Sequence, residues 1–150
     1  VPREDIRFYC PHPLDRANAL ANAAKAESPL EVVLVCETGG GRIGGYAWFR
    51  WSDPAAAHST FGICIGRELQ GRGAGRALMV RLAEIAETVG PPAMRLTVQL
   101  ANARAVALYR SMGFRVVREQ MRAKDDAGYG FPPEPEYAME RETRRPPAVR

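Results

Sequence analysis

The sequence predicts a single α/β domain in which helices flank a mixed, mostly antiparallel central sheet. Three observations lead to this fold class. Short runs of strand-forming residues alternate with longer stretches of helical periodicity, and clusters of glycine or proline separate them. The 150 residues, 46% hydrophobic and 25% charged, suit one globular domain. We expect this domain to span residues 1–142 and residues 143–150 to form a disordered tail.

The first part of the chain is expected to form a strand, a helix and a second strand. A brief apolar patch at residues 6–9 predicts the first strand. The alanine-rich segment 14–26 predicts a helix with one apolar stripe, and Pro29 follows its end. Residues 31–37, with a continuous apolar centre, predict the second strand.

Two further strands are expected before the longest helix. Residues 43–51 are aromatic and follow a glycine turn, and residues 59–65 are short and apolar, so the three successive strands form an antiparallel meander. Gly44 and Gly45 indicate a bulge or the close approach of another backbone segment.

The second half of the chain is expected to contain two helices and three strands. A helix begins within the glycines at 71–75, because apolar residues then recur at helical spacing up to Val89. A second helix follows Asn102, a residue suited to an N-cap, and ends at Gly113. The expected strands are 94–100, 114–122 and 136–141, the last two joined by a proline-rich loop.

Composition excludes several classes of protein. The net charge of +4 lies partly in arginines of the tail and forms no basic stripe, so we expect no nucleic-acid surface. No run has the length of a membrane span, and no signal peptide is visible. The three cysteines, Cys10, Cys36 and Cys64, show no metal-binding spacing, so no metal site is predicted. Their pattern favours a reducing cytoplasmic location.

The glycine-rich turn from Gln70 to Arg76 lies between an apolar strand and the amphipathic helix. Strand, glycine turn and helix present unpaired backbone N–H groups at a helix N-terminus, where the helix dipole favours an anion. Arg72 and Arg76 add mobile positive charge. The turn lacks the Gly-Lys-Ser/Thr ending of a Walker loop, and its glycine spacing differs from the Rossmann fingerprint. We interpret it as a pyrophosphate-binding turn; a glycine turn without a ligand is the alternative.

A second motif begins about 30 residues later, where Asn102, Ala105, Leu108, Tyr109, Gly113 and Phe114 fit the pattern Asn-x-x-Ala-x-x-Leu-Tyr-x-x-x-Gly-Phe. Together with Gln-x-x-Gly-x-Gly, this pattern resembles the acetyl-CoA site of the GNAT superfamily of N-acetyltransferases, over residues 30–141. The resemblance implies a GNAT-like fold and acetyl-CoA as co-substrate. It implies that the pantetheine arm is held by Ile63, Cys64 and Ile65, and the pyrophosphate by Gln70, Gly71, Arg72, Gly73, Ala74, Gly75 and Arg76.

The resemblance also implies that Asn102 contacts the cofactor and that Tyr109 donates a proton to the leaving thiolate. A phenol of pKa about 10 can protonate a thiolate whose thiol has a pKa of about 8.5, although the transfer is uphill. From spacing alone, Tyr109 could equally be a core aromatic residue and Asn102 a simple cap. Backbone N–H groups near Cys64 are candidates to stabilise the developing oxyanion.

The acceptor side is less defined by the sequence. Family members that acetylate ribosomal protein N-termini often carry glutamate where this chain has Thr97. His58 is the candidate base or water relay, with a surface histidine as the alternative, and Glu68 is a weaker candidate. The loop and strand that follow residue 122 carry acids and aromatic residues suited to a cationic or aromatic amine: Asp125, Asp126, Tyr129, Phe131, Glu134 and Glu136. A solvated surface loop is the alternative.

The function predicted from the sequence is therefore transfer of an acetyl group from acetyl-CoA to a primary amine. The amine belongs to a small molecule or a peptide and attacks directly within a ternary complex. A non-catalytic acyl-CoA sensor on the same fold is the alternative, and a nucleotide-binding protein is a third class. A homodimer is left open.

Overall fold

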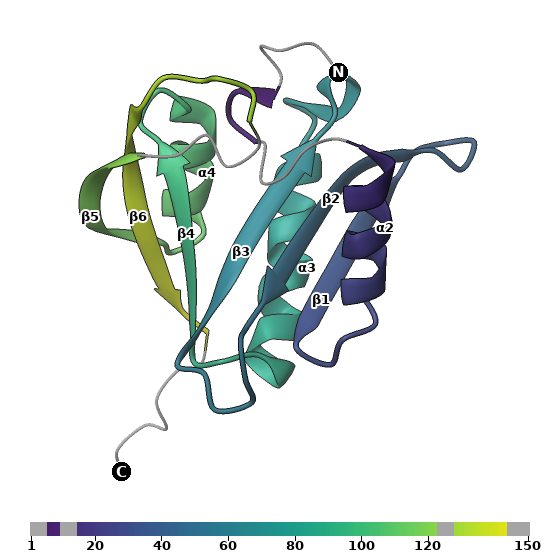
Figure 1. Ribbon diagram of the computed structural model, residues 1–150, viewed down its shortest axis with the longest axis horizontal. Coiled ribbons are helices and arrows are strands. Elements are labelled where there is room, and N and C mark those ends of the chain that lie inside the picture. The colour runs from purple at the N-terminus through teal and green to yellow at the C-terminus, as the bar shows by residue number, and fades with distance from the viewer. Residues whose placement is uncertain (1–5, 10–14, 123–127, 144–150) are drawn as a thin grey trace.

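The computed structural model describes residues 6–9, 15–122 and 128–143, which form one six-stranded sheet with helices on both faces (Figure 1). The strand order is β1-β2-β3-β4-β6-β5. The strands are β1 (Glu31–Glu37), β2 (Ile43–Arg50), β3 (His58–Ile65), β4 (Ala93–Gln99), β5 (Arg115–Arg122) and β6 (Glu134–Glu142). The helices are α2 (Arg16–Lys25), the 3-10 helix η1 (Arg67–Leu69), α3 (Ala74–Val89) and α4 (Ala103–Ser111).

The pairing of β3 with β4 sets the shape of the sheet. Every other neighbouring pair is antiparallel, whereas β3 and β4 are parallel. In the described strands their register runs from His58–Thr60 to Ala93–Arg95 and stops there. Beyond this point the two strands diverge toward their carboxyl ends (Figure 1). The facing backbone edges, from Phe61 in β3 and Leu96 in β4 onward, therefore have no strand partner.

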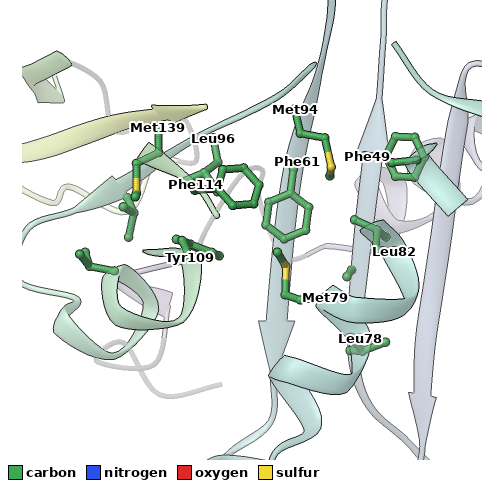
Figure 2. Packing of buried hydrophobic residues seen from close by; sticks show 14 residues of the cluster. Phe49, Phe61, Leu78, Met79, Leu82, Met94, Leu96, Tyr109, Phe114 and Met139 are labelled. Carbon is green, nitrogen blue, oxygen red and sulfur yellow. The ribbon is translucent and has the colours of Figure 1, made fainter. Parts of the chain in front are cut away.

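The core lies between the sheet and the pair α3 and α4. Leu82 of α3, Phe49 of β2 and Met139 of β6 are fully buried in one cluster. Phe61 of β3 contacts Tyr109 of α4 edge-on, with ring centroids 5.9 Å apart, and Figure 2 shows both among the buried side chains. Shortening such a residue to alanine leaves a cavity that the close-packed neighbours fill only in part, so the free energy of unfolding falls by about 2–5 kcal/mol. This cluster fixes α4 against the far half of the sheet.

The glycine pair in β2 fulfils the expectation of a bulge and a close backbone approach. The register of β1 with β2 shifts between Cys36 and Glu37, opposite this pair. A Cβ on Gly44 would lie 2.5 Å from Leu69 Cδ1, and the Gly66 amide donates to the Gly44 carbonyl at 2.8 Å. The missing side chain at Gly44 thus lets η1 pack onto β2 and positions the glycine turn that follows.

At the start of the chain one sequence expectation is wrong, and another is confirmed without the burial that an apolar stripe usually brings. Residues 6–9 form no strand: Ile6 is helical, residues 7 and 8 form a turn, and the Tyr9 amide donates to the Ile6 carbonyl at 3.2 Å. The helix at 14–26 forms as α2 with Asp15 as its N-cap, but its expected apolar stripe buries no residue. Leu20 is 60% exposed, since alanines provide too little apolar area to attach α2 to the sheet.

The last described residue is anchored. Thr143 is buried, its amide donates to the Pro92 carbonyl at 2.8 Å, and its hydroxyl donates to the Pro91 carbonyl. Residues 144–150 of the expected tail, and Asp125 and Asp126, lie outside the described residues. Within the described chain no helix has the length and apolar character needed to cross a membrane, and no three His, Cys, Asp or Glu residues gather as metal ligands.

Candidate acyl-CoA and acceptor site

The divergence of β3 and β4 opens into a cavity of about 1000 Å³. It joins residues from β3, β4, the glycine turn and α4, which are far apart in the sequence. The predicted site residues that line it are His58, Ile63, Cys64, Ile65, Gln70, Gly71, Gly75, Asn102 and Tyr109. Arg72, Gly73, Ala74 and Arg76 belong to the same turn but do not line this cavity. Tertiary folding therefore brings most of the predicted residues to one place.

The glycine turn leaves the N-terminus of α3 open. Gly71 and Gly73 have φ of 73° and 84°, values that favour glycine, and a Cβ at either would meet nothing within 4 Å. Gly73 is the N-cap and offers no side chain to the helix. The first amide bonded back to this cap is that of Ala77, at 2.9 Å. The preceding amides of α3 have no hydrogen-bond partner among the described residues, so they fit a diphosphate.

Gln70 fastens this turn to its surroundings. Its Nε2 donates to the Ile65 carbonyl at 3.0 Å, at the end of β3. Its Oε1 accepts from Arg104 Nη1 of α4 at 3.2 Å. Arg104 also lines the cavity, and the sequence reasoning missed it. The sequence placed Arg104 in the first turn of α4, two residues after Asn102, which could have marked it as a candidate site residue. Only the fold brings that turn beside Gln70.

The two arginines of the turn, Arg72 and Arg76, do not line the cavity. The Arg76 guanidinium is exposed and is directed toward the end of α4, where its Nη2 donates to Ser111 Oγ at 2.9 Å. Arg72 is exposed. Arg104 is therefore better placed than Arg76 to meet an anion at the cavity.

Tyr109 lies where the core and the cavity meet. Its residue is 7% exposed and packs between Phe61 and Phe114, each with ring centroids 5.9 Å from its own. It also lines the cavity, and its hydroxyl makes no hydrogen bond to a described residue. Burial raises the pKa of the Tyr109 phenol well above its usual value of 10. The phenol consequently stays protonated at neutral pH.

Asn102 has the capping role that the sequence allowed. Its Oδ1 accepts from the Ala105 amide at 3.3 Å at the start of α4. The same residue lines the cavity. Its side-chain amide group, which the cap does not use, remains available for a ligand.

The candidate bases occupy different places. His58 begins β3 and lines the cavity, with Nε2 3.3 Å from Arg95 Nη1. Because arginine can only donate, Nε2 accepts and the ring hydrogen is on Nδ1. Arg95 Nε in turn donates to Glu140 at 2.7 Å, which lowers the pKa of that carboxyl. Glu68 does not line the cavity, since its carboxylate lies near Gly66.

Aromatic residues border the other face of the opening. Trp48 of β2 lies across Gly62 of β3, where a Cβ would come within 2.6 Å of its ring. Its Nε1 donates to the Tyr9 hydroxyl at 2.8 Å, so the turn at residues 6–9 is held over the sheet. Of the expected acceptor residues, Glu134 is paired with Arg7 at 2.8 Å. Tyr129 and Phe131 pack with Ile6.

Comparison with known proteins identifies the family. Residues 3–114 match the model described as the acetyltransferase (GNAT) family. The chain therefore belongs to the GNAT family. Its strand order and the opening between β3 and β4 agree with this assignment.

Individual relatives are more distant. The chain is 28% identical over 144 residues to a mycothiol acetyltransferase from Thermobifida fusca, covering 88% of this chain and 43% of that protein. It is 31% identical over 133 residues to the mycothiol acetyltransferase of Beutenbergia cavernae, covering 85% and 42%. The chain thus spans less than half the length of these relatives.

A solved structure of a putative acetyltransferase from Salmonella typhimurium with its cofactor acetyl-CoA is also similar. It superimposes with a TM-score of 0.75 at 25% identity, covering 91% of this chain and 79% of that one.

Proposed function

We propose that this protein is an N-acetyltransferase that transfers an acetyl group from acetyl-CoA to a primary amine. The amine belongs to a small molecule or a peptide and attacks directly in a ternary complex. One observation carries the proposal: the open N-terminus of α3, the unpaired edge of β3 and the phenol of Tyr109 all border the same cavity. In this proposal the N-terminus of α3 binds the diphosphate, the edge of β3 pairs with amide groups of the cofactor, and the phenol donates a proton.

The described residues fit acetyl-CoA in two places. The amides that begin α3, with Arg104 beside them, would hold the diphosphate by charge-assisted hydrogen bonds. The edge of β3 that faces β4 at Ile63–Ile65 has no strand partner within the described sheet, although the Ile65 carbonyl accepts from Gln70. It would pair with the amides of the pantetheine arm, as an added strand would. Acetyl-CoA would supply an acetyl group activated as a thioester.

In this proposal, Tyr109 provides a proton to the departing sulfur. Its raised pKa keeps the proton on the phenol at neutral pH but makes the transfer to a thiolate more uphill. Catalysis then depends on holding the hydroxyl close to the sulfur as negative charge develops there. The packing of Tyr109 between Phe61 and Phe114 provides that fixed position.

For the proton of the acceptor amine we propose His58, acting directly or through a water molecule. A lysine-like amine is neutral in only about one part in a thousand at pH 7, so a proton acceptor raises the rate. His58 must first release the Arg95 contact at Nε2. If His58 is the base, His58→Gln lowers kcat/KM for the acceptor amine and leaves acetyl-CoA affinity unchanged; an unchanged kcat/KM removes His58 from the scheme.

Two measurements test the proposed function. Calorimetric titration with acetyl-CoA is expected to show binding at sub-millimolar concentration; absence of binding contradicts the proposal. A screen of amines, antibiotics, polyamines and peptides for thiol release from acetyl-CoA then identifies acceptors.

A non-catalytic acyl-CoA sensor on the same fold is the second candidate. The burial of Tyr109 in the core favours it, because such a tyrosine also serves as a packing residue. Tyr109→Phe separates the two: an enzyme loses turnover and retains binding, whereas a sensor is unaffected.

A further inference from the structure

Three polar side chains form a row across β4, β6 and β5. Gln99 lies directly opposite Glu136, and Glu136 lies directly opposite Gln120. Directly paired residues of antiparallel strands project from the same face of a sheet. All three line the cavity, and Glu136 is 7% exposed. A carboxylate is thus placed at low exposure in the wall formed by β4, β6 and β5.

Glu136 differs from the other acids that β6 places near arginines. Glu134 is paired with Arg7 at 2.8 Å, and Glu140 with Arg95 at 2.7 Å. Glu136 has no ion pair with any described residue; it accepts a hydrogen bond from Gln120 Nε2 at 2.7 Å. A carboxylate removed from water requires compensation by donors or a cation. The described residues supply a neutral amide, which leaves a place for a cationic group.

The same amide holds an arginine. Gln120 Oε1 accepts from Arg118 Nε at 2.9 Å. Arg118 lines the cavity, and it forms no ion pair within the described part of the chain. Gln120 therefore stands between a carboxylate and a guanidinium and contacts both. The terminal nitrogens of Arg118 remain available for a planar anion such as a carboxylate.

The charge of the cavity decides between a dication and a zwitterion. Its charged lining is Arg67, Arg95, Arg104, Arg118, Arg122 and Glu136. Arg104 is held at the glycine turn and Arg95 is bound to Glu140. Arg67 belongs to η1, next to the same turn, so the cavity arginines on the strand paired with Glu136 are Arg118 and Arg122 of β5. One carboxylate next to two arginines disfavours a second ammonium group on the acceptor. It favours a ligand that carries both charges.

We propose that Glu136 and Arg118 form an acceptor subsite for a free amino acid. Glu136 binds the α-ammonium group and Arg118 binds the α-carboxylate, with Gln120 fixing the distance between them. This inference rests on the proposed acetyltransferase function and adds the class of acceptor.

Calorimetry on the protein saturated with coenzyme A provides the test. The twenty common L-amino acids are titrated, and each that binds is compared with its own amide, which keeps the ammonium and lacks the carboxylate. We expect at least one amino acid to bind about tenfold more tightly than its amide, because a charge-assisted hydrogen bond is lost. Absence of binding by every amino acid, or equal binding of acid and amide, overturns the proposal.

Two variants assign the two charges. Arg118→Gln is expected to abolish the preference for acid over amide, and Glu136→Gln to weaken acid and amide alike by about tenfold. Arg115→Gln and Glu142→Gln are matched controls, since they make the same charge changes on the same strands outside the cavity. If the controls lower affinity as much as the test variants, the effect is one of overall charge and the subsite is wrong.

The test distinguishes failure of the subsite from failure of the proposed function. All four variants are expected to bind coenzyme A with native affinity and to retain the native free energy of unfolding within about 1 kcal/mol. A wild-type protein that does not bind coenzyme A contradicts the acetyltransferase proposal itself. A protein that binds coenzyme A and acetylates amines without regard to an α-carboxylate contradicts the subsite alone.

Discussion

The N-termini of α3 and α4 border the same cavity but are capped differently. At α3 the N-cap is Gly73 with φ of 84°, and no side chain accepts from the helix. At α4 the N-cap is Asn102, whose side chain accepts from the Ala105 amide. The side-chain cap of α4 satisfies one of that helix's first amides, whereas no described side chain does so at α3.

This difference supports the start of α3, and not the start of α4, as the proposed anion site. A side-chain cap stabilises a helix by about 1 kcal/mol, so an uncapped N-terminus costs stability unless something else accepts its hydrogen bonds. The space beside the N-terminus of α3 is also empty, since a Cβ added at Gly71 or Gly73 would contact no described atom within 4 Å. The α4 end lacks both features and instead contributes the side chains of Asn102 and Arg104 to the cavity.

The largest effect is expected from a substitution that blocks the N-terminus of α3. Gly73→Val places a branched side chain at φ of 84° and in the open space at the start of α3 where we propose that the diphosphate binds. We expect acetyl-CoA affinity, measured by calorimetry, to fall by about 100-fold or more, equivalent to about 2.7 kcal/mol.

Gly40→Val is the matched control, because Gly40 has φ of 90° in a hairpin turn, with nothing within 4 Å of an added Cβ. It should lose similar stability in denaturant unfolding without loss of acetyl-CoA affinity. Native affinity in Gly73→Val would refute the phosphate assignment.

The next largest effect is expected at Tyr109, on the far turn of α4. Tyr109→Phe should lower kcat by about 100-fold and leave acetyl-CoA binding unchanged. Because burial raises the phenol pKa, the protonated form persists above pH 10. The pH–rate profile of the native enzyme should therefore rise with acceptor deprotonation and show no descending limb below pH 10.

Tyr137→Phe serves as the control, since Tyr137 is partly buried on β6 and does not line the cavity. Equal kcat for Tyr109→Phe and the native protein would leave the sensor as the better function.

A smaller effect is expected from Arg104, and it tests whether a positive charge on α4 strengthens anion binding at the N-terminus of α3. Arg104→Gln should weaken acetyl-CoA binding by about tenfold at low salt and reduce its salt dependence, because one cation near the diphosphate is lost. Arg76→Gln is its counterpart, and its guanidinium is directed to Ser111. Equal losses in both variants would show that general positive charge, and not the Gln70–Arg104 link, attracts the ligand.

The smallest effect concerns the cap itself. Asn102→Ala should lower the free energy of unfolding by about 1 kcal/mol, measured in urea, because the Ala105 amide loses its acceptor. Asn102→Asp retains a capping oxygen and should unfold like the native protein. If Asn102 also donates to the cofactor, both variants weaken acetyl-CoA binding by about fivefold; unchanged binding in Asn102→Asp reduces its role to capping.

Local patterns predicted most of the elements but not how they attach. The strand at 31–37 and the cap at Asn102 were predicted correctly, because an apolar run of strand-forming residues and a capping side chain both act within a few residues. The helix at 14–26 was also predicted, yet its stripe is exposed, since burial depends on the partner and not on the helix alone. The glycine pair in β2 indicated a close approach, and only the structure identified Leu69 as the neighbour.

The sequence by itself determined the order of the strands and α-helices from residue 15 onward, the glycine turn and the Asn102–Phe114 motif, because these depend on spacing along the chain. Only the tertiary structure decided that Arg104 meets Gln70 and that Glu136, Gln120 and Arg118 gather in one wall of the cavity. The reason is physical: the register between β4, β6 and β5 is set by pairing between distant segments. No local pattern records which residues such pairing places side by side.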